Sequence, residues 1–323
     1  MRLRRNLSML RRPAAWGALG HQVAWRLAGH RPEPRPLSWP LAPGDAEAIR
    51  ILWPERYGWR NEGQMLAPVR RGLEALVRVE TADIPQPQHN MAVIRFQVDG
   101  RSIDVGIDFE DRPLLHRSAD ALPLVFKMQH QREGYGRDNV VPGGYVSKRQ
   151  DLYRHYAALR RFGDRRSDKY EVYGRFSLKY APEVRQDVIG RLQAQQRFHF
   201  EGGLDVVTWG EYMREVCQSR MCLDLPGRGA FTHRMVEYLA VGACVLAVPH
   251  KAVLHVPLEA GEHIVYGRED HSDVVDLAAR YLEDDAARAR VAQNARDYFD
   301  RYLRPEQLAA YYLDRCLDVV RAG

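Results

Sequence analysis

Short apolar segments alternate with longer amphipathic segments through the second half of the chain. Apolar runs of strand length lie near residues 140–146, 170–174, 197–201, 221–225, 244–248 and 263–266. Stretches with helical spacing lie between them, near 149–162, 183–195, 209–219 and 232–241. Strands that alternate with helices in this way form a parallel sheet with helices on its faces. The pattern therefore predicts a doubly wound α/β domain.

Three further helices are predicted after this alternation. We expect Ser272 to cap the first, the second to bury an apolar face that includes Val291 and Phe299, and Pro305 to start the third. Their aromatic stripes are interpreted as core faces.

The first half of the chain has a different pattern. Residues 92–109 alternate apolar and polar positions on both sides of Asp99-Gly100, which is a strong hairpin signal. A helix is expected around 63–79 and a strand over 122–128. We therefore predict a reduced α/β amino-terminal domain over 45–138 and the doubly wound domain, with its carboxyl-terminal helices, over 139–323.

Residues 1–44 are interpreted as a basic leader and a proline-rich linker. Residues 1–32 hold seven arginines and no acidic residue, and removing these seven from the 48 basic residues leaves 41 against 42 acidic ones. The rest of the chain is therefore nearly neutral, so we expect no nucleic acid partner. The leader either lies as an amphipathic helix on an anionic membrane surface or is disordered or loosely docked.

Cysteine use indicates a reducing compartment. Cys217, Cys222, Cys244 and Cys316 show no metal-binding spacing, so we interpret them as reduced, mostly buried thiols. No run of 18 apolar residues is present, and the leader is a poor secretory signal. We therefore expect a cytoplasmic protein, with possible peripheral contact between residues 1–32 and the inner face of the membrane.

Three basic side chains crowd the start of the predicted helix at 232–241. Arg228, His233 and Arg234 lie where the helix dipole is already positive, and Gly227 and Gly229 precede the helix. In a doubly wound sheet this loop lies at the ligand-binding edge, where free backbone N–H groups bind anions. A bound phosphate would make the cation cluster favourable. The alternative is that Glu237 pairs with His233 and Arg234 along the helix.

Other glycine-bearing loops are expected at the same edge. Gly143 and Gly144 precede the 149–162 helix, and Gly174 and Gly202 follow two of the strands. With Lys148, Arg149 and Arg175 nearby, these loops favour a diphosphate ligand, although any turn can require glycine. Neither a Walker A motif nor a GxGxxG motif is present, which disfavours an ATPase or an ordinary dehydrogenase.

Two stretches in the second half of the chain resemble a known family. The stretches PGRGAFTHRMVEYLAVGACVLAVP and GEHIVYGREDHSDVVDLAARYLEDDAARARVAQNARDYF, within 139–320, resemble the nucleotide-sugar-binding half of a GT-B glycosyltransferase of the group 1 type. The last helices also resemble bacterial relatives of exostosin and capsule transferases. The resemblance implies that Glu237 holds the donor ribose and that the loop and helix start hold the diphosphate. Many retaining members carry a glutamate at the position of Gly229, so their mechanism is not implied here.

Candidate catalytic groups lie in Asp108-Phe109-Glu110-Asp111. An inverting sugar transferase needs a general base near the acceptor hydroxyl, and Asp108 or Asp111 is a candidate. The alternative is a solvated acidic turn. No His/Asp/Glu group has zinc spacing, so we predict no metal and no cofactor beyond the donor as co-substrate.

The sequence therefore predicts a metal-independent glycosyltransferase. We expect it to use a nucleoside-diphosphate sugar and a glycan or lipid-linked glycan acceptor in cell-surface polysaccharide synthesis. The alternative is a non-catalytic sugar-nucleotide or polyanion binding module tethered by its basic leader.

Overall fold

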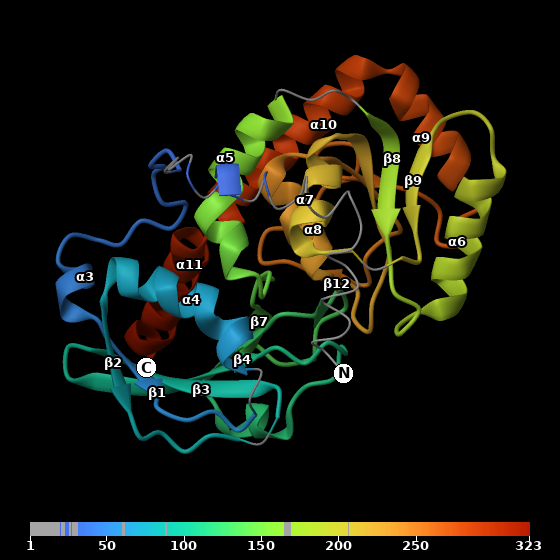
Figure 1. Ribbon diagram of the computed structural model, residues 1–323. Coiled ribbons are helices and arrows are strands. Elements are labelled where there is room, and N and C mark those ends of the chain that lie inside the picture. Colours follow the sequence, from blue (N-terminus) through green and yellow to red (C-terminus); the bar gives the residue numbers. More distant parts are fainter. Residues whose placement is uncertain are drawn as a thin grey trace.

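Two large β-sheets and one two-stranded sheet, with helices packed around them, make up the body of the protein (Figure 1). The structure, a computed structural model, describes residues 20, 23–25, 27, 32–59, 62–87, 89–164, 169–205 and 207–323. The first part of the chain forms α3 (Asp45–Ala48), β1 (Arg50–Pro54), α4 (Glu62–Leu76), β2 (Arg78–Ala82), β3 (Met91–Val98), β4 (Arg101–Asp108), η1 (Arg117–Ala121), β5 (Leu124–Lys127), β6 (His130–Gln131) and β7 (Val140–Pro142).

The remaining elements build the second sheet and the helices around it. They are α5 (Gln150–Asp164), β8 (Tyr170–Arg175), α6 (Pro182–Ala194), β9 (Phe200–Gly203), α7 (Trp209–Cys217), β10 (Ser219–Asp224), α8 (His233–Val241), β11 (Cys244–Ala247), β12 (Ala252–Val253), β13 (Val265–Tyr266), α9 (Val274–Glu283), α10 (Asp285–Tyr298), η2 (Phe299–Leu303) and α11 (Pro305–Ala322).

The predicted hairpin is confirmed in the first sheet. This sheet has the order β2-β1-β3-β4-β5-β7, and Val98 pairs with Arg101 across the turn between β3 and β4. Asp99 and Gly100 both have positive φ, at 49° and 76°, which the tight hairpin turn requires. The strands β1 and β2, which pair in parallel, were not predicted.

The predicted doubly wound domain is also confirmed. All neighbours are parallel in the second sheet, whose order is β13-β11-β10-β8-β9. Two successive residues of β8 lie on opposite faces of this sheet. Val172 packs with α6 and α9, whereas Tyr173 packs with α7 and α8. The connections after β8 and β10 therefore leave on opposite faces. The switch point between these two strands is where such sheets bind ligands.

One strand belongs to the other sheet. We expected the run at 140–146 to be part of the second sheet, but β7 covers only Val140–Pro142 and pairs with β5 in the first sheet. An apolar run reports burial and not the identity of its partner, which explains the error. The predicted division at residues 138 and 139 stays a prediction, and we propose moving it to the carboxyl side of Pro142.

The last helix returns to the first sheet. α11 packs against α4 and β4, and Figure 1 shows α11 (dark red) beside α4. The ring of Tyr312 stacks on Phe126 at 3.8 Å, and its hydroxyl donates to the carbonyl of Gly143. One hydrophobic core therefore runs through both parts of the chain.

Gly72 sets the close approach of α4 and α11. A Cβ atom at this position would overlap the backbone of Pro305. We expect Gly72→Ala to lower the free energy of unfolding by about 1–3 kcal/mol, as overpacked core substitutions do. Gly190→Ala in α6 is the matched control, because nothing lies within 4 Å of its added Cβ, so helix propensity should leave stability equal or higher. Urea denaturation measures both, and equal stability of the two variants would contradict this packing.

The helices after the second sheet differ from prediction at one cap. α9 follows Asp273, and Ser272 bonds to Asp270 instead of capping the helix, so the predicted Ser272 cap is wrong. Pro305 begins α11, as predicted. All four cysteines are free and buried, also as predicted.

The proline-rich linker is docked onto the helices at the end of the chain. Ser38 N–H donates to the side chain of Gln307, and Arg304 donates to the carbonyl of Glu33. Within the leader, Trp25 is buried against Phe162 and Trp209. The seven leader arginines lie outside the described residues. Among the described residues, no helix combines the length and apolar character that a membrane span needs.

Candidate active site

A cleft of about 840 Å³ opens where loops of the two sheets face each other. Its walls come from the loops after β4, β8 and β10 and from the starts of α4 and α8. The residues that line it are Trp59, Gln64, Met65, Asn90, Phe109, Glu110, Asp111, Lys148, Lys179, Tyr180, Arg228 and His233. The cleft therefore includes the switch point between β8 and β10, where the fold predicts a ligand.

The loop between β10 and α8 is fixed from both sides. Thr232 caps α8 by accepting from Met235 N–H, and its hydroxyl donates to buried Asp224 at 2.6 Å. From the first half of the chain, the Gln129 amide donates to the carbonyl of Phe231 and accepts from its N–H, both at 3.0 Å. The loop is therefore held in one conformation before any ligand binds.

Three cations in the cleft lack a carboxylate partner. Within the part of the chain that the structure describes, Lys148, Lys179 and Arg228 have no Asp or Glu oxygen within 4.0 Å. Lys179 and Arg228 lie over the ring of Tyr180, at 5.1 and 5.7 Å. These charges are available to an anionic ligand, which would bring them together favourably.

The structure separates the three cations that the sequence places together. Arg228 faces the cleft, as expected. His233 also lines it, but burial and then the charge of Lys148 lower its pKa to about 4, so the ring is neutral at pH 7. Its Nδ1 lies 3.0 Å from the carbonyl of Val146. Arg234 does not line the cleft and instead lies over the ring of Phe176, at 4.6 Å, near Asp224.

Glu237 is buried away from the cleft. Only 4% of it is exposed, its carboxylate accepts from Ser147 Oγ at 2.9 Å, and burial raises its pKa. Neither His233 nor Arg234 lies within 4.0 Å of this carboxylate, so the alternative pairing along the helix is wrong. In this conformation Glu237 does not line the cleft, and its role toward a ribose stays a prediction.

Six other predicted donor residues also lie outside the cleft lining: Gly227 and Gly229, which flank Arg228, and Gly143, Gly144, Arg149 and Arg175. Arg175 is bound by Glu215 at 2.7 Å and by Glu201 at 2.8 Å, so its charge is already neutralised. Gly143 and Gly144 follow β7 and lie against α11, where a Cβ on Gly144 would meet Leu308. Arg149 is exposed at the start of α5. Gly144 has a φ of 68°, which favours glycine in this turn without any ligand.

Asp108 holds the acidic turn and is not exposed to the cleft. Its carboxylate pairs with Lys127 Nζ at 2.9 Å, and both side chains are 0% exposed. It also accepts from the N–H groups of Glu110 and His116. Because every contact fixes the loop that follows β4, we assign Asp108 to positioning and withdraw it as a candidate base.

Asp111 lines the cleft, and its role as a general base stays a prediction. It is half-buried, and burial followed by the charge of Glu110 raises its pKa, while Arg228 opposes the shift. Its backbone carbonyl lies against Gly229, where an added Cβ would overlap it. No side chain therefore fits at position 229, which explains physically why the glutamate of many retaining enzymes is absent there.

Two features of the cleft were not predicted. Lys179 and Tyr180 come from the loop after β8, which carries no motif, although its place at the switch point is a usable signal. Gln129 acts from the other sheet. Among the described residues, no group of three or more His, Cys, Asp or Glu side chains is arranged to hold a metal.

Residues 165–314 match the family model described as glycosyl transferase-like. No protein with curated annotation matches the chain.

Similar solved structures are distant in sequence. A glycosyltransferase from Rickettsia africae ESF-5 is 11% identical over 68% of this chain and 71% of that one, with a TM-score of 0.43. TarM is 11% identical over 63% of this chain and 44% of its own, with a TM-score of 0.35. A mutant of TarM from S. aureus in complex with Fondaparinux, alpha-GlcNAc-glycerol and UDP is 14% identical over 63% of this chain and 45% of its own, with a TM-score of 0.36. The match thus spans less than half the length of the two TarM structures.

The family match covers β8 to the first part of α11, and so contains the switch point and the loops that carry Lys179 and Arg228, whereas Lys148 precedes it. This chain therefore carries a glycosyl transferase-like domain over residues 165–314.

Proposed function

We propose that the cleft binds a nucleoside-diphosphate sugar and that the enzyme transfers the sugar to a hydroxyl of a glycan or lipid-linked glycan. The observation that carries this proposal is the group of three cations without carboxylate partners, Lys148, Lys179 and Arg228, around an 840 Å³ cleft at the switch point. A bound diphosphate would supply the negatively charged partner that these three cations lack.

The donor phosphates would lie between the loop after β8 and the start of α8. Arg228 and Lys179 approach from the two loops, and Gly227 and Gly229 let the ligand come close to the backbone. The first turn of α8 adds the backbone N–H groups with which helix starts bind anions. Charge that develops on the leaving diphosphate would be stabilised by groups already in position.

The acceptor would enter from the side of the first sheet. Its hydroxyl oxygen attacks the anomeric carbon, the bond from that carbon to the diphosphate oxygen breaks, and the hydroxyl proton passes to the Asp111 carboxylate. The nucleoside diphosphate leaves with the bonding electrons. Trp59, 40% exposed on this wall, offers an apolar face for a sugar ring. A role in cell-surface polysaccharide synthesis beside the inner face of the membrane is part of the same proposal.

Release of nucleoside diphosphate from a panel of donor sugars tests this function. The double variant Lys148→Ala/Arg228→Ala should lower kcat/KM by about 100-fold or more, because charged hydrogen bonds contribute about 1.5–3 kcal/mol each. Arg154→Ala on the exposed part of α5 is the control and should behave as wild type. If the double variant turns over a donor at the wild-type rate, the cleft does not bind the donor in this reaction.

The pH profile tests the electrostatics around Asp111. The base acts only when it is deprotonated, so kcat/KM should fall as the pH drops through the Asp111 pKa. Glu110 raises this pKa and Arg228 lowers it. Glu110→Gln should therefore move the acidic limb to lower pH, and Arg228→Ala should move it to higher pH. Profiles of kcat/KM between about pH 4 and pH 8 measure the acidic limb of each variant. If the two limbs shift in the same direction, Asp111 is not the group that titrates.

A further inference from the structure

One buried side chain joins two of the loops that line the cleft. Arg185 lies near the start of α6 and is 2% exposed. Its guanidinium donates to the carbonyl of Pro226, from Nε at 3.1 Å and from Nη2 at 2.8 Å. Its Nη1 donates to the carbonyl of Ser177. These two carbonyls lie in the loops after β10 and β8, so one guanidinium ties the two loops together. We call these three hydrogen bonds the arginine clamp.

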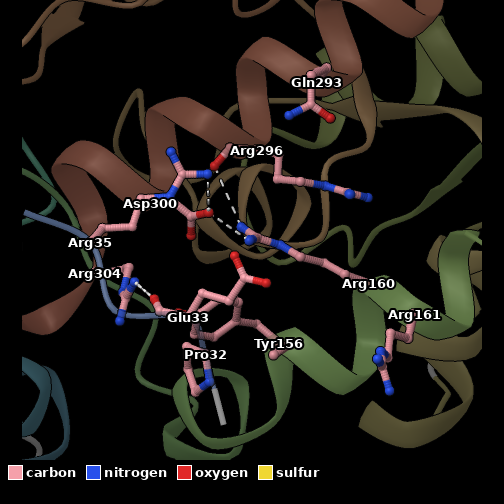
Figure 2. Close-up of a pocket in the computed structure, with 11 residues that line it drawn as sticks. Pro32, Glu33, Arg35, Tyr156, Arg160, Arg161, Gln293, Arg296, Asp300 and Arg304 are labelled. Carbon is pink, nitrogen blue, oxygen red and sulfur yellow. Dashed lines mark hydrogen bonds and ion pairs between the residues drawn. The ribbon is translucent and has the colours of Figure 1, made fainter. Parts of the chain in front are cut away.

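Arg185 is held differently from other arginines inside the protein. Figure 2 shows a cavity of about 330 Å³ in which Arg160 pairs with Asp300, at 2.7 Å. Arg304 in the same cavity pairs with Glu306 at 3.6 Å. In the described part of the chain, by contrast, no carboxylate oxygen lies within 4.0 Å of the Arg185 guanidinium. No ion pair offsets the cost of removing this cation from water, so its place is explained by the loops that it holds.

The loop after β8 adopts a conformation that needs such a restraint. Ala181, which precedes Pro182, lies in the left-handed region with φ 44° and ψ 52°. This region is unfavourable for alanine, and a following proline restricts the backbone further. Such backbone persists only where surrounding contacts hold it. Arg185 holds both ends of the segment, because its N–H donates to the carbonyl of Ala181 at 3.1 Å and its side chain to that of Ser177.

We propose that Arg185 is a positioning residue for the donor, which fixes Lys179 and Arg228 relative to each other. Each of these cations lies two residues after one of the clamped carbonyls. Both lie over the same ring, that of Tyr180. Arg185 does not line the cleft, so it acts through the two cations and not by contact with the ligand. The inference rests on the proposed function, in which these cations hold the donor diphosphate.

Isothermal titration of the full chain with UDP, GDP and ADP at low salt tests the positioning role. Arg185→Gln should weaken the binding seen in wild type at least tenfold. In Lys179→Ala/Arg228→Ala the same substitution should weaken it less than threefold, because no cation is left to position. Arg185→Lys keeps the charge but lacks the planar fork that reaches both carbonyls, so it should weaken binding as Arg185→Gln does. Arg191→Gln, on an exposed part of α6 where Arg191 pairs with Asp187, is the matched control and should bind as wild type.

Amide hydrogen exchange in the free protein tests the clamp without any nucleotide. The N–H groups of Lys179 and Gly227 are hydrogen-bonded, to Ser177 Oγ at 3.2 Å and to the carbonyl of Gly229 at 3.1 Å. Both amides should exchange at least tenfold faster in Arg185→Gln, because the two loops open more often without the clamp. The control Arg191→Gln should exchange as wild type.

Faster exchange together with a loss of affinity that depends on the two cations supports the inference. It is overturned if both loops exchange in Arg185→Gln as in wild type, or if the diphosphate binds this variant as tightly as wild type. An equal loss in both cation backgrounds would show that Arg185 acts by its own charge and not by positioning. If no nucleotide binds wild type, the proposed function fails and the donor role of Arg185 fails with it, whereas faster exchange would still show that the clamp holds the loops.

Discussion

Asp111→Asn should lower kcat by about two to four orders of magnitude, the usual contribution of a positioned general base. The asparagine keeps the shape of the side chain in the cleft but cannot take the proton from the hydroxyl of the acceptor substrate. Its stability should stay close to that of wild type. Because the pKa of Asp111 is raised in the folded protein, its ionised form is the less favourable one there, and the amide resembles the neutral form.

Single-turnover kinetics with the donor identified by the release assay measures this effect. Glu110→Gln is the matched control, since Glu110 is the neighbouring carboxylate in the cleft and is bound to Arg112. Its kcat should fall less than tenfold at a pH well above the Asp111 pKa. If Asp111→Asn also stays within tenfold of wild type, another group takes the proton.

Lys127→Met should lower the free energy of unfolding by about 3–5 kcal/mol, the usual result of removing one partner of a buried ion pair. Asp108 would remain at 0% exposure without its cation, supported only by two backbone N–H groups. Lys127 Nζ also holds the carbonyl of Glu110 at 2.9 Å, so the loop that carries Asp111 should loosen as well. Activity should therefore fall together with stability.

Urea denaturation compares this variant with Arg95→Met. Arg95 also pairs with an aspartate, Asp104 at 2.7 Å, but these side chains are 39% and 38% exposed. Exposed pairs contribute about 0–1 kcal/mol, so this control should lose little stability. Equal losses in the two variants would show that burial of the Lys127–Asp108 pair has no special effect.

The sequence predicted those parts of the fold that depend on residues close together in the chain. The Asp99-Gly100 hairpin and the strand-helix alternation from Tyr170 to Ala247 appear as expected. The sheet that receives β7 could not be read from its residues, because partner choice depends on distant strands. The return of α11 to the first sheet depends on Gly72, a single small residue more than 200 positions away.

The candidate site was predicted only in part for a related reason. The loop with Gly227, Arg228 and Gly229 carries a local signal, and it lines or borders the cleft. Whether a cation is free depends on partners far along the chain: Arg175 is neutralised by Glu215, 40 positions later. Burial also decides whether a side chain is charged, since it lowers the pKa of His233 and makes the ring neutral at pH 7.

The most direct test of the donor site is a thermal-shift panel of UDP, GDP, ADP and CMP on wild type, Arg228→Ala and Arg234→Ala. A ligand at about 100 times its Kd stabilises the folded state by about 2.7 kcal/mol, which raises Tm measurably. We predict that one diphosphate raises the Tm of wild type, that Arg228→Ala loses most of this shift, and that Arg234→Ala, whose side chain packs on Phe176, keeps more of it. If no nucleotide stabilises wild type at millimolar concentration, or if Arg228→Ala is stabilised as strongly as wild type, the cleft is not the donor site.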